Sequence, residues 1–228
     1  MNSALVTVYM PTKDRNSLCN RALESIASQE LSNCIECIII AINNATGLFI
    51  TGCDDDDIYE SGRIANFLNY WYKKRSYGTT LLHSNVKERS ANKERILKYK
   101  KFVYLNNIKR KNCIGNQIFT LTSHMRSTLF DENIKVWEDW ELWIRLIDEY
   151  GRSENIGDST YIVDTSHQHS RITTNTASDA VDATCEYLMT VQKTSGHTLH
   201  NLFIGSLLYY RLITFNNNHQ CVRLLDIF

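Results

Sequence analysis

The stretch Leu48–Tyr59 places four consecutive aspartates, Asp54–Asp57, directly after a short apolar run. The apolar run is typical of a buried strand, and Gly52 permits a turn after it. Four adjacent carboxylates repel one another, so a fold that keeps them together needs a cation nearby. Ligands bind at the carboxyl ends of strands in open α/β sheets, and hard divalent cations take carboxylate oxygens and substrate phosphates. The run therefore predicts a metal–phosphate site, with a solvated acidic loop as the alternative.

Apolar runs typical of strands alternate with apolar stripes at helical spacing over most of the chain. Leu5–Met10 is rich in β-forming residues and stops at Pro11. The apolar stripe over residues 18–27 indicates a helix that Asn16 or Ser17 caps. A strand, a tight turn and a helix in this order are the opening of a nucleotide-binding α/β unit. We therefore predict an α/β fold with three layers and a mostly parallel sheet.

The connection after the second predicted strand is short. Ile35–Ile40 is apolar on both faces, as an interior parallel strand should be, and only Ala41–Gly47 separates it from the strand before the aspartates. Parallel neighbours in a sheet need a crossover of about a dozen residues or more. Either the two strands are not a conventional βαβ pair, or a helix has been lost between them.

A second group of carboxylates begins a strongly amphipathic helix at Trp137–Leu146. Glu138, Asp139 and Glu141 all fall in its first turn, where the helix dipole favours negative charge. That preference is the structural alternative to a catalytic role for all three residues. Between the two acidic groups we predict a hairpin or long loop at Lys98–Tyr104, a strand at Asn116–Leu121 and a turn at Met125–Phe130.

A polar segment follows the short predicted strand Tyr161–Val163 and contains His167, His169 and Arg171. Imidazole is a common metal ligand, so either histidine could complete a metal shell. The arginine could hold a diphosphate through charge-assisted hydrogen bonds. The alternative is an exposed loop without a ligand.

Length and pattern predict one main domain over residues 1–175 and a helical extension over residues 176–228 that packs on it. Within the extension, Leu199–Ile213 is dense in apolar and aromatic residues. This segment packs on the domain or contacts a membrane surface, and packing is the expected role.

The charge is balanced overall but segregated along the chain. Lysine plus arginine and aspartate plus glutamate both number 25, while Lys73–Lys111 holds 13 basic residues against Glu88 and Glu94, a net charge of +11. A face this basic attracts phosphates, a lipid surface or nucleic acid, unless it is a solvated surface that offsets acid elsewhere.

Seven cysteines, an odd number, argue against a disulfide framework in a chain of 228 residues. We see neither a secretory signal nor an apolar run long enough to span a bilayer. The sequence therefore indicates a reducing compartment and a protein that is soluble or peripheral to a membrane.

Four segments in this order resemble the inverting family 2 glycosyltransferases of the GT-A fold, especially bacterial enzymes that build surface polysaccharides such as O-antigen. They are the first strand and proline–threonine turn at 6–15, the first helix at 22–29, the strand with its aspartates at 45–57, and the acidic helix start at 137–143. The resemblance covers roughly residues 6–174. It implies a hexosyltransferase that moves a sugar from a nucleotide-diphosphate donor, with a UDP-sugar as first choice, to a polyprenyl-pyrophosphate-linked saccharide.

The resemblance also implies roles for individual residues. Pro11, Thr12 and Arg15 would lie where the nucleotide binds, and Asp139 would be the catalytic base. Asp54 and Asp56 would bind a divalent cation, Mn²⁺ or Mg²⁺, that stabilises the leaving diphosphate as a Lewis acid. Asp56 would be the first choice for direct metal contact, and Asp57 would orient that shell. Asp54 and Arg171 would contact the diphosphate, and His169 (or His167) would complete the metal shell. Glu138 and Glu141 would lie beside the acceptor.

The sequence departs from this family at the short connection. After its second strand the family carries a further turn, helix, strand and helix start, and this chain passes directly from Ile40 to Ala41–Gly47. The shortfall from crossover geometry and the shortfall against the family fall at the same place. The chain therefore resembles an internally shortened member in which part of the nucleotide site is missing.

Three hypotheses follow, in this order. The first is an active metal-dependent transferase in the cytoplasm, peripheral at the inner face of the bacterial membrane. The second is a non-catalytic or impaired remnant of the family, suggested by the missing segment. The third is a nucleic-acid-binding protein built on the basic stretch, ranked last because the chain shows neither a recognition helix nor an RNA-binding signature. We therefore expect no nucleic-acid partner.

Overall fold

The computed structural model describes residues 4–12, 15–39, 42–166, 178–196 and 199–216. Its larger sheet has seven strands in the order β2-β1-β3-β9-β5-β10-β8, and a smaller sheet has four in the order β4-β11-β6-β7. The bounds in the larger sheet are β1 Val6–Tyr9, β2 Ile35–Ile38, β3 Phe49–Gly52, β5 Thr79–His83, β8 Phe102–Val103, β9 Phe119–Leu121 and β10 Arg152–Asn155. Those in the smaller sheet are β4 Ile58–Tyr59, β6 Val86–Ser90, β7 Lys93–Leu97 and β11 Tyr161–Asp164.

Seven α-helices and two short 3-10 helices connect these strands in the described residues. They are α1 Asn16–Ala27, α2 Arg63–Lys73, α3 Leu105–Ile108, α4 Thr122–Thr128, α5 Glu138–Tyr150, α6 Ser178–Ser195, α7 Asn201–Asn216, η1 Ser32–Cys34 and η2 Ile42–Asn44. Within these ranges no helix combines the length and the apolar character that crossing a bilayer requires.

The large sheet confirms the predicted α/β fold. Strands β2, β1 and β3 pair in parallel, as do β5 and β10, while β9 runs antiparallel between β3 and β5 and β8 is antiparallel to β10. Five of the seven strands therefore point the same way. Parallel strands bring their carboxyl ends to one edge of the sheet, which is where the aspartates follow β3.

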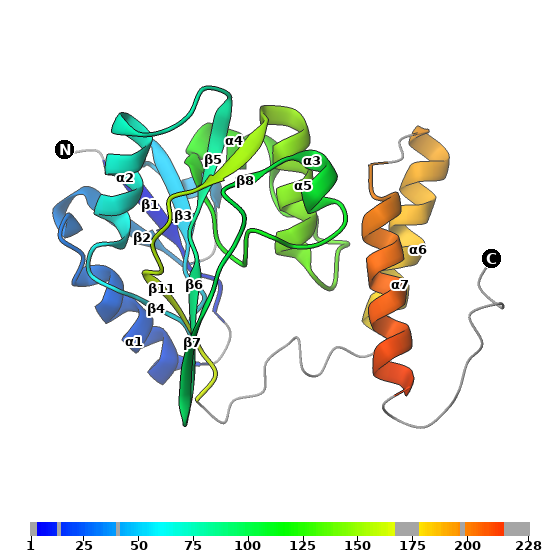
Figure 1. Ribbon diagram of the computed structural model, residues 1–228, viewed down its shortest axis with the longest axis horizontal. Helices are drawn as coiled ribbons and strands as arrows, with labels where there is room; N and C mark the ends of the chain where they lie inside the picture. The colour runs from blue at the N-terminus through cyan, green and yellow to red at the C-terminus, as the bar shows by residue number, and fades with distance from the viewer. Residues whose placement is uncertain (1–3, 13–14, 40–41, 167–177, 197–198, 217–228) are drawn as a thin grey trace.

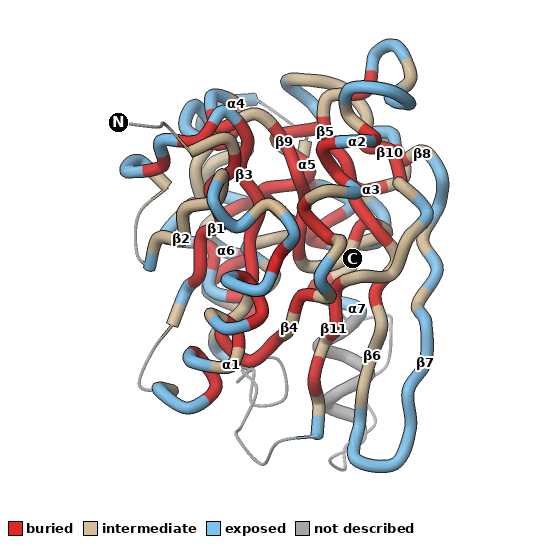
Figure 2. The backbone as a smooth tube through the Cα atoms, turned by 90° about the vertical axis from the view of Figure 1, so that its left-hand side faces the viewer, coloured by how far each residue is buried: buried red, intermediate tan, exposed pale blue. Residues whose placement is uncertain are grey.

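Helices cover both faces of this sheet, and two apolar clusters fill the layers between. Neighbouring strand residues point to opposite faces. Phe49 stacks on Phe119 in the cluster with α1 and α2, whereas Ile50 lies in the cluster with α5. Figure 1 shows α1 and α2 on one side of the strands and α5 on the other. Most of the central strand residues are buried, as Figure 2 shows. The predicted three layers are thus present.

The strand order shows what the short connection joins. β2 and β3 are not neighbours, because both pair with β1 and lie on either side of it. The two strands are therefore not a conventional βαβ pair of neighbours, which was the first of our two alternatives. The prediction that Ile35–Ile40 is an interior strand is wrong, since β2 stands at the sheet edge and its residues are only partly buried. No described strand covers its outer side.

Helices α6 and α7 form a pair beyond α5 (Figure 1). Their described contacts reach α5 and the segment before it. The Lys135 backbone N–H donates to Thr184 Oγ1 over 3.0 Å, and the rings of Trp140 and Phe203 meet edge to face with centroids 4.9 Å apart. Phe203 and Leu207 of α7 are fully buried. The boundary that we predicted at residue 175 lies outside the described residues.

Of two local predictions, one holds in part and one is wrong. Lys98–Tyr104, expected as a hairpin or long loop, is a loop that contains only the short strand β8, and the hairpin lies earlier in the chain, where β6 and β7 pair antiparallel. Met125–Phe130, expected as a turn, largely belongs to α4. In both cases the apolar pattern is weak: the β6–β7 hairpin is mostly polar and exposed, and α4 buries only Thr122 and Met125. Packing, rather than local pattern, decides these segments.

Candidate active site

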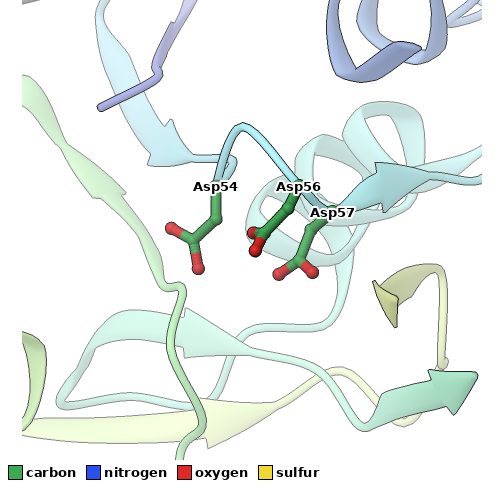
Figure 3. Close-up of side chains that lie close together, drawn as sticks. All are labelled: Asp54, Asp56 and Asp57. Carbon is green, nitrogen blue, oxygen red and sulfur yellow. The ribbon is translucent and has the colours of Figure 1, made fainter. Parts of the chain in front are cut away.

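The four aspartates form the turn between β3 and β4, which we call the acidic turn (Asp54–Asp57). The side chains of Asp54, Asp56 and Asp57 point toward the same space (Figure 3). One carboxylate oxygen from each lies within 4.8 Å of the others. Asp55, Asp56 and Asp57 are buried, with exposed fractions of 1%, 7% and 0%. This burial excludes the alternative of a solvated acidic loop.

Asp54 is positioned by two amides in the segment just before the neighbouring strand β9. Asn116 Nδ2 donates to Asp54 Oδ2 over 2.7 Å, and Gln117 Nε2 donates to Asp54 Oδ1 over 2.8 Å. Gly52 makes room for this arrangement, because a Cβ there would lie 1.9 Å from Gln117 Oε1. The same oxygen accepts the hydroxyl of Tyr9 over 3.2 Å. The carboxylate is therefore fixed through both neighbours of β3.

Asp57 shares one of these amides. Asn116 Nδ2 lies 3.2 Å from Asp57 Oδ2, and the backbone N–H of Asp164 donates to Asp57 Oδ1 over 3.1 Å. Burial raises the pKa of Asp57 well above its usual value, and the negative charges of Asp54 and Asp56 raise it further. A bound cation would relieve this repulsion.

Two arginines of the first helical unit supply positive charge to the acidic turn. Arg15 Nη1 lies 3.1 Å from Asp56 Oδ2 and 3.3 Å from Asp55 Oδ1. Arg21 Nη2 donates to the Asp56 carbonyl over 2.7 Å, and its Nη1 pairs with Asp164 Oδ2 at 2.6 Å. These two arginines supply part of the positive charge that the four adjacent carboxylates require.

The donor set fits a hard divalent cation. Asp54, Asp56 and Asp57 offer only oxygen atoms, as Mg²⁺ and Mn²⁺ prefer. Asp55 Oδ1 lies 3.3 Å from Arg15 Nη1, and its Oδ2 is buried without a hydrogen-bond partner among the described residues. The histidine ligand and the diphosphate contact that we predicted, His169 and Arg171, lie outside the described residues, as does His167.

The first turn of α5 carries the second carboxylate group. Trp137, the residue before the helix, has a φ of 55°, a left-handed conformation that L-residues with bulky side chains seldom adopt. Glu138 is exposed, and Asp139 is half-buried with Oδ1 2.6 Å from the backbone N–H of Trp140. Burial raises the pKa of Asp139 to about 8, and the charges of Glu138 and Asp54 contribute.

Glu141 lies one step further along the helix in a different environment. It is 2% exposed, and Arg145 grips both of its oxygens, with Nε–Oε1 and Nη2–Oε2 distances of 2.7 Å. His200 Nε2 lies 2.9 Å from Oε1. Burial alone would raise the pKa of Glu141, but the hydrogen bonds from His200 and Arg145 lower it. These contacts favour a structural link between α5 and the α6–α7 pair over the acceptor contact that we expected.

The acidic turn and Asp139 lie near enough for their charges to interact. Burial raises the pKa of Tyr9, and the charges of Asp54, Asp139 and Glu138 raise it further. The segment between α3 and β9 joins the two groups. Trp140 Nε1 donates to the Ile108 carbonyl over 2.5 Å, and Trp143 Nε1 donates to that of Gly115 over 3.1 Å. The next two residues, Asn116 and Gln117, hold Asp54.

The remaining predicted residues lie at the same edge of the sheet. Pro11 and Thr12 follow β1, whose last residue Tyr9 is in register with Gly52 at the end of β3. Pro11 is exposed and Thr12 is half-buried. Asn116 and Gln117 were not predicted as site residues, because the sequence indicated only a strand there. Two adjacent amides at the start of a strand predicted to be apolar were the available signal.

Known proteins that resemble this chain in sequence and known proteins that resemble it in fold are both glycosyltransferases. No protein-family profile matches the chain. It is 27% identical over 218 residues to the Escherichia coli (strain K12) protein named as the colanic acid biosynthesis glycosyl transferase WcaA, an alignment that covers 76% of this chain and 77% of that one.

Solved structures share the fold at low sequence identity. TarS 1-349 from S. aureus in complex with UDP-GlcNAc aligns with a TM-score of 0.59 and 12% identity over 82% of this chain and 66% of that chain. TarS 1-349 without a named ligand gives a TM-score of 0.56, 15% identity and coverages of 70% and 60%. This chain thus spans less than two thirds of either TarS chain.

The mannosyltransferase PcManGT from Pyrobaculum calidifontis, solved with GDP-Man and Mn²⁺, aligns with a TM-score of 0.52 and 9% identity. That alignment covers 96% of this chain and 89% of PcManGT. The chain is therefore similar, in sequence and in fold, to glycosyltransferases of the GT-A type.

Proposed function

We propose that the chain transfers a sugar from a nucleoside-diphosphate donor to an acceptor hydroxyl with inversion at the anomeric carbon. The observation that carries the proposal is a metal-compatible group of three carboxylates after β3, one of which, Asp54, acts by its charge on the high-pKa carboxyl of Asp139. One group suits the leaving diphosphate, and the other suits the attacking hydroxyl.

Asp54 and Asp56 would hold a divalent cation, with Asp57 beside them. A cation held there supplies Lewis-acid stabilisation of the negative charge that develops on the leaving diphosphate. The protein's own contribution is to fix Asp54 through Asn116 and Gln117, so the carboxylate does not reorganise when the donor binds. Since Arg15 already contacts Asp56, we expect weak cation binding without nucleotide, whose phosphates complete the shell.

Asp139 would act as the general base. The acceptor oxygen attacks the anomeric carbon on the face opposite the leaving group, the bond to the diphosphate oxygen breaks, and the hydroxyl proton passes to the Asp139 carboxylate. A base is most efficient when its pKa lies near the operating pH. Burial and the neighbouring Glu138 and Asp54 place the pKa of Asp139 at about 8, well above that of an ordinary aspartate.

The donor class is supported by the similar structures, which contain UDP-GlcNAc in one case and GDP-Man with Mn²⁺ in another. We propose a UDP-sugar as first choice, with Pro11, Thr12 and Arg15 beside the nucleotide. The exposed Pro11 and half-buried Thr12 border the acidic turn at the end of β1.

We propose a lipid-linked saccharide as the acceptor, in surface polysaccharide synthesis at the inner face of the cytoplasmic membrane. The name of the Escherichia coli relative, a polysaccharide biosynthesis enzyme, supports the pathway class. In Figures 1 and 2 the tip of the β6–β7 hairpin lies at the lower end of the molecule, below α3.

The impaired-remnant hypothesis remains the second candidate because β2 is an edge strand and residues 39–48 lead directly to β3. A diphosphate held by its phosphates alone leaves the base free to move, and misplacement by about 1 Å can lower a rate about 100-fold. Inserting a family-like segment after Ile40 tests this. A higher transfer rate in the extended chain supports impairment, and equal rates contradict it.

Calorimetric titration with uridine and guanosine diphosphates, with and without Mn²⁺, tests the donor site. We expect binding that requires Mn²⁺ and that weakens at least about tenfold in Asp56→Asn, because a metal contact is lost. Glu60→Gln is the matched control, since Glu60 lies just after the acidic turn and pairs with Lys87 instead. Equal loss in both variants would mean that the run acts only as diffuse negative charge.

A further inference from the structure

A hollow of about 460 Å³ lies beside α3, outside the groups described so far. It is lined by Lys100, Asn106, Asn107, Arg110, Lys111 and Cys113. This volume is in the range of small-ligand sites, which span about 300–1,000 Å³. Three of the lining side chains are cationic, two are amides, and none is acidic. The hollow is therefore suited to an anion.

The cations of the hollow differ from those of the neighbouring hairpin. On β6 and β7, Lys87, Arg89 and Arg95 pair with glutamates. In the part of the chain that the structure describes, no carboxylate forms an ion pair with Lys100, Arg110 or Lys111. Like charges that line one hollow repel one another until an anion binds among them. Three cations of the hairpin are thus paired with carboxylates, whereas the hollow has positive charge available for a ligand.

The environment of the Cys113 thiol and the orientation of the Asn107 amide also suit a bound anion. The charges of Lys100 and Lys111 both act on Cys113, although burial raises the pKa of this thiol overall. The backbone N–H of Tyr104 donates to Asn107 Oδ1 over 3.1 Å, which orients the amide at the start of α3. Cationic and amide N–H groups are the usual donors to phosphate oxygens.

The chain segment that lines the hollow also contacts the candidate active site. The carbonyl of Ile108, between its lining residues, accepts Trp140 Nε1, and Trp140 follows Asp139 directly. Further along the same segment, Asn116 and Gln117 hold Asp54. Any group bound in the hollow is thus fixed to the helix that carries Asp139, on a segment distinct from the acidic turn.

We propose that this hollow binds the phosphate groups of an anionic acceptor, a diphosphate joined to the sugar whose hydroxyl meets Asp139. The proposal rests on the proposed transferase function and names the charged part of its acceptor. Arg110, Lys111 and Lys100, which all line the hollow, bind the phosphate oxygens. This site requires no metal, which separates it from the donor site at the acidic turn.

Protection of Cys113 from alkylation tests the proposal at the site itself. The full chain is treated with a limiting amount of iodoacetamide in EDTA, and labelling of each cysteine is followed by mass spectrometry as inorganic pyrophosphate is added. We expect pyrophosphate to slow labelling of Cys113, because an anion in the hollow blocks the thiol and disfavours its thiolate. Cys34, also partly exposed but next to β2, is the internal control.

Two variants locate the effect. In Arg110→Gln with Lys111→Gln, the pyrophosphate concentration that gives half protection should rise at least about tenfold, since hydrogen bonds to charged groups are lost. Lys93→Gln, at the exposed start of β7, removes one positive charge outside the hollow and should leave this concentration within about twofold. Unchanged melting temperatures show that the variants remain folded, and Mn²⁺-dependent nucleotide binding in them reports the donor site separately.

A third arm separates the two sources of the anion. An alkyl diphosphate in neutral detergent represents the lipid-linked form, and inorganic pyrophosphate represents the free one. Protection by both supports the proposal with the diphosphate as the recognised group, and protection by the alkyl diphosphate alone supports it with the lipid as part of the ligand. Protection by neither, or equal protection of Cys113 and Cys34, would overturn the proposal even if nucleotide binding is intact.

Discussion

The acidic turn after β3 and the first turn of α5 both gather carboxylates, but the protein treats the two groups differently. In the acidic turn, Asn116 and Gln117 hold Asp54, and Arg15 lies against Asp55 and Asp56. These contacts keep negative charges together where a cation can bind. In α5, burial and nearby negative charge instead raise the pKa of Asp139 to about 8.

Within α5 itself the contrast is sharper. Asp139 and Glu141 are two residues apart on one helix turn, yet the pKa of the first is raised and that of the second is lowered. Glu141 is paired by Arg145 and His200, and Asp139 has acidic neighbours. The comparison teaches that carboxylates in a helix N-terminal turn are distinguished by what packs beside them, since the helix dipole acts on both alike.

The largest expected effect comes from removing the high-pKa carboxyl. Asp139→Asn should lower the turnover number by about 100-fold or more, the scale of general-base catalysis, and leave Mn²⁺-dependent nucleotide binding unchanged. Single-turnover rates together with calorimetry measure the two quantities. Weakened donor binding with normal turnover would reverse the roles that we give to the two acidic groups.

Glu141→Gln tests the other half of the contrast. Removing one member of a buried, bidentate ion pair should lower the free energy of unfolding by about 3 kcal/mol, because Arg145 loses its partner. We expect the turnover number per folded molecule to stay within about twofold. Chemical denaturation and active-site titration give these values. If Glu141→Gln instead keeps full stability and loses turnover, Glu141 contacts the acceptor as the sequence suggested.

A smaller effect concerns stability as a function of pH. Below about pH 4 the Asp139 carboxyl is protonated in both the folded and the unfolded chain. As the pH rises from there to about 8, the folded state keeps a proton that the unfolded state has lost, so the wild type becomes less stable than Asp139→Asn. We expect the variant to melt higher at pH 8, by about 2–4 °C for each 1 kcal/mol of this difference, and at nearly the same temperature at pH 4. A constant difference between the two would contradict the raised pKa.

The sequence could predict the elements with strong patterns. The buried strand before Asp54 and the amphipathic helix after Trp137 each combine a clear apolar period with an acidic end, so both the elements and their carboxylates were identified. The resemblance to glycosyltransferases depended on these same segments. These sequence patterns are strong because one face of each element is buried, and burial selects apolar residues at regular spacing.

The rest depended on which segments meet. Nothing in Asn116 or Gln117 indicates that β9 runs beside β3, and that pairing alone brings both amides to Asp54. β2 is as apolar as an interior strand, but it lies at the edge because the chain returns from it to the far side of β1. The different environments of Asp139 and Glu141 likewise come from contacts with distant residues such as His200.

The pH dependence of donor cleavage tests the central claim most directly. Initial rates of nucleoside diphosphate release would be measured from UDP-GlcNAc and GDP-mannose with Mn²⁺, with a sugar-linked alkyl diphosphate or water as the acceptor. Because only ionised Asp139 accepts the proton, kcat/KM should rise about tenfold per pH unit below a pKa of about 8 and level off above it. Asp139→Asn should lack this rise. The same profile in both proteins would show that Asp139 is not the base.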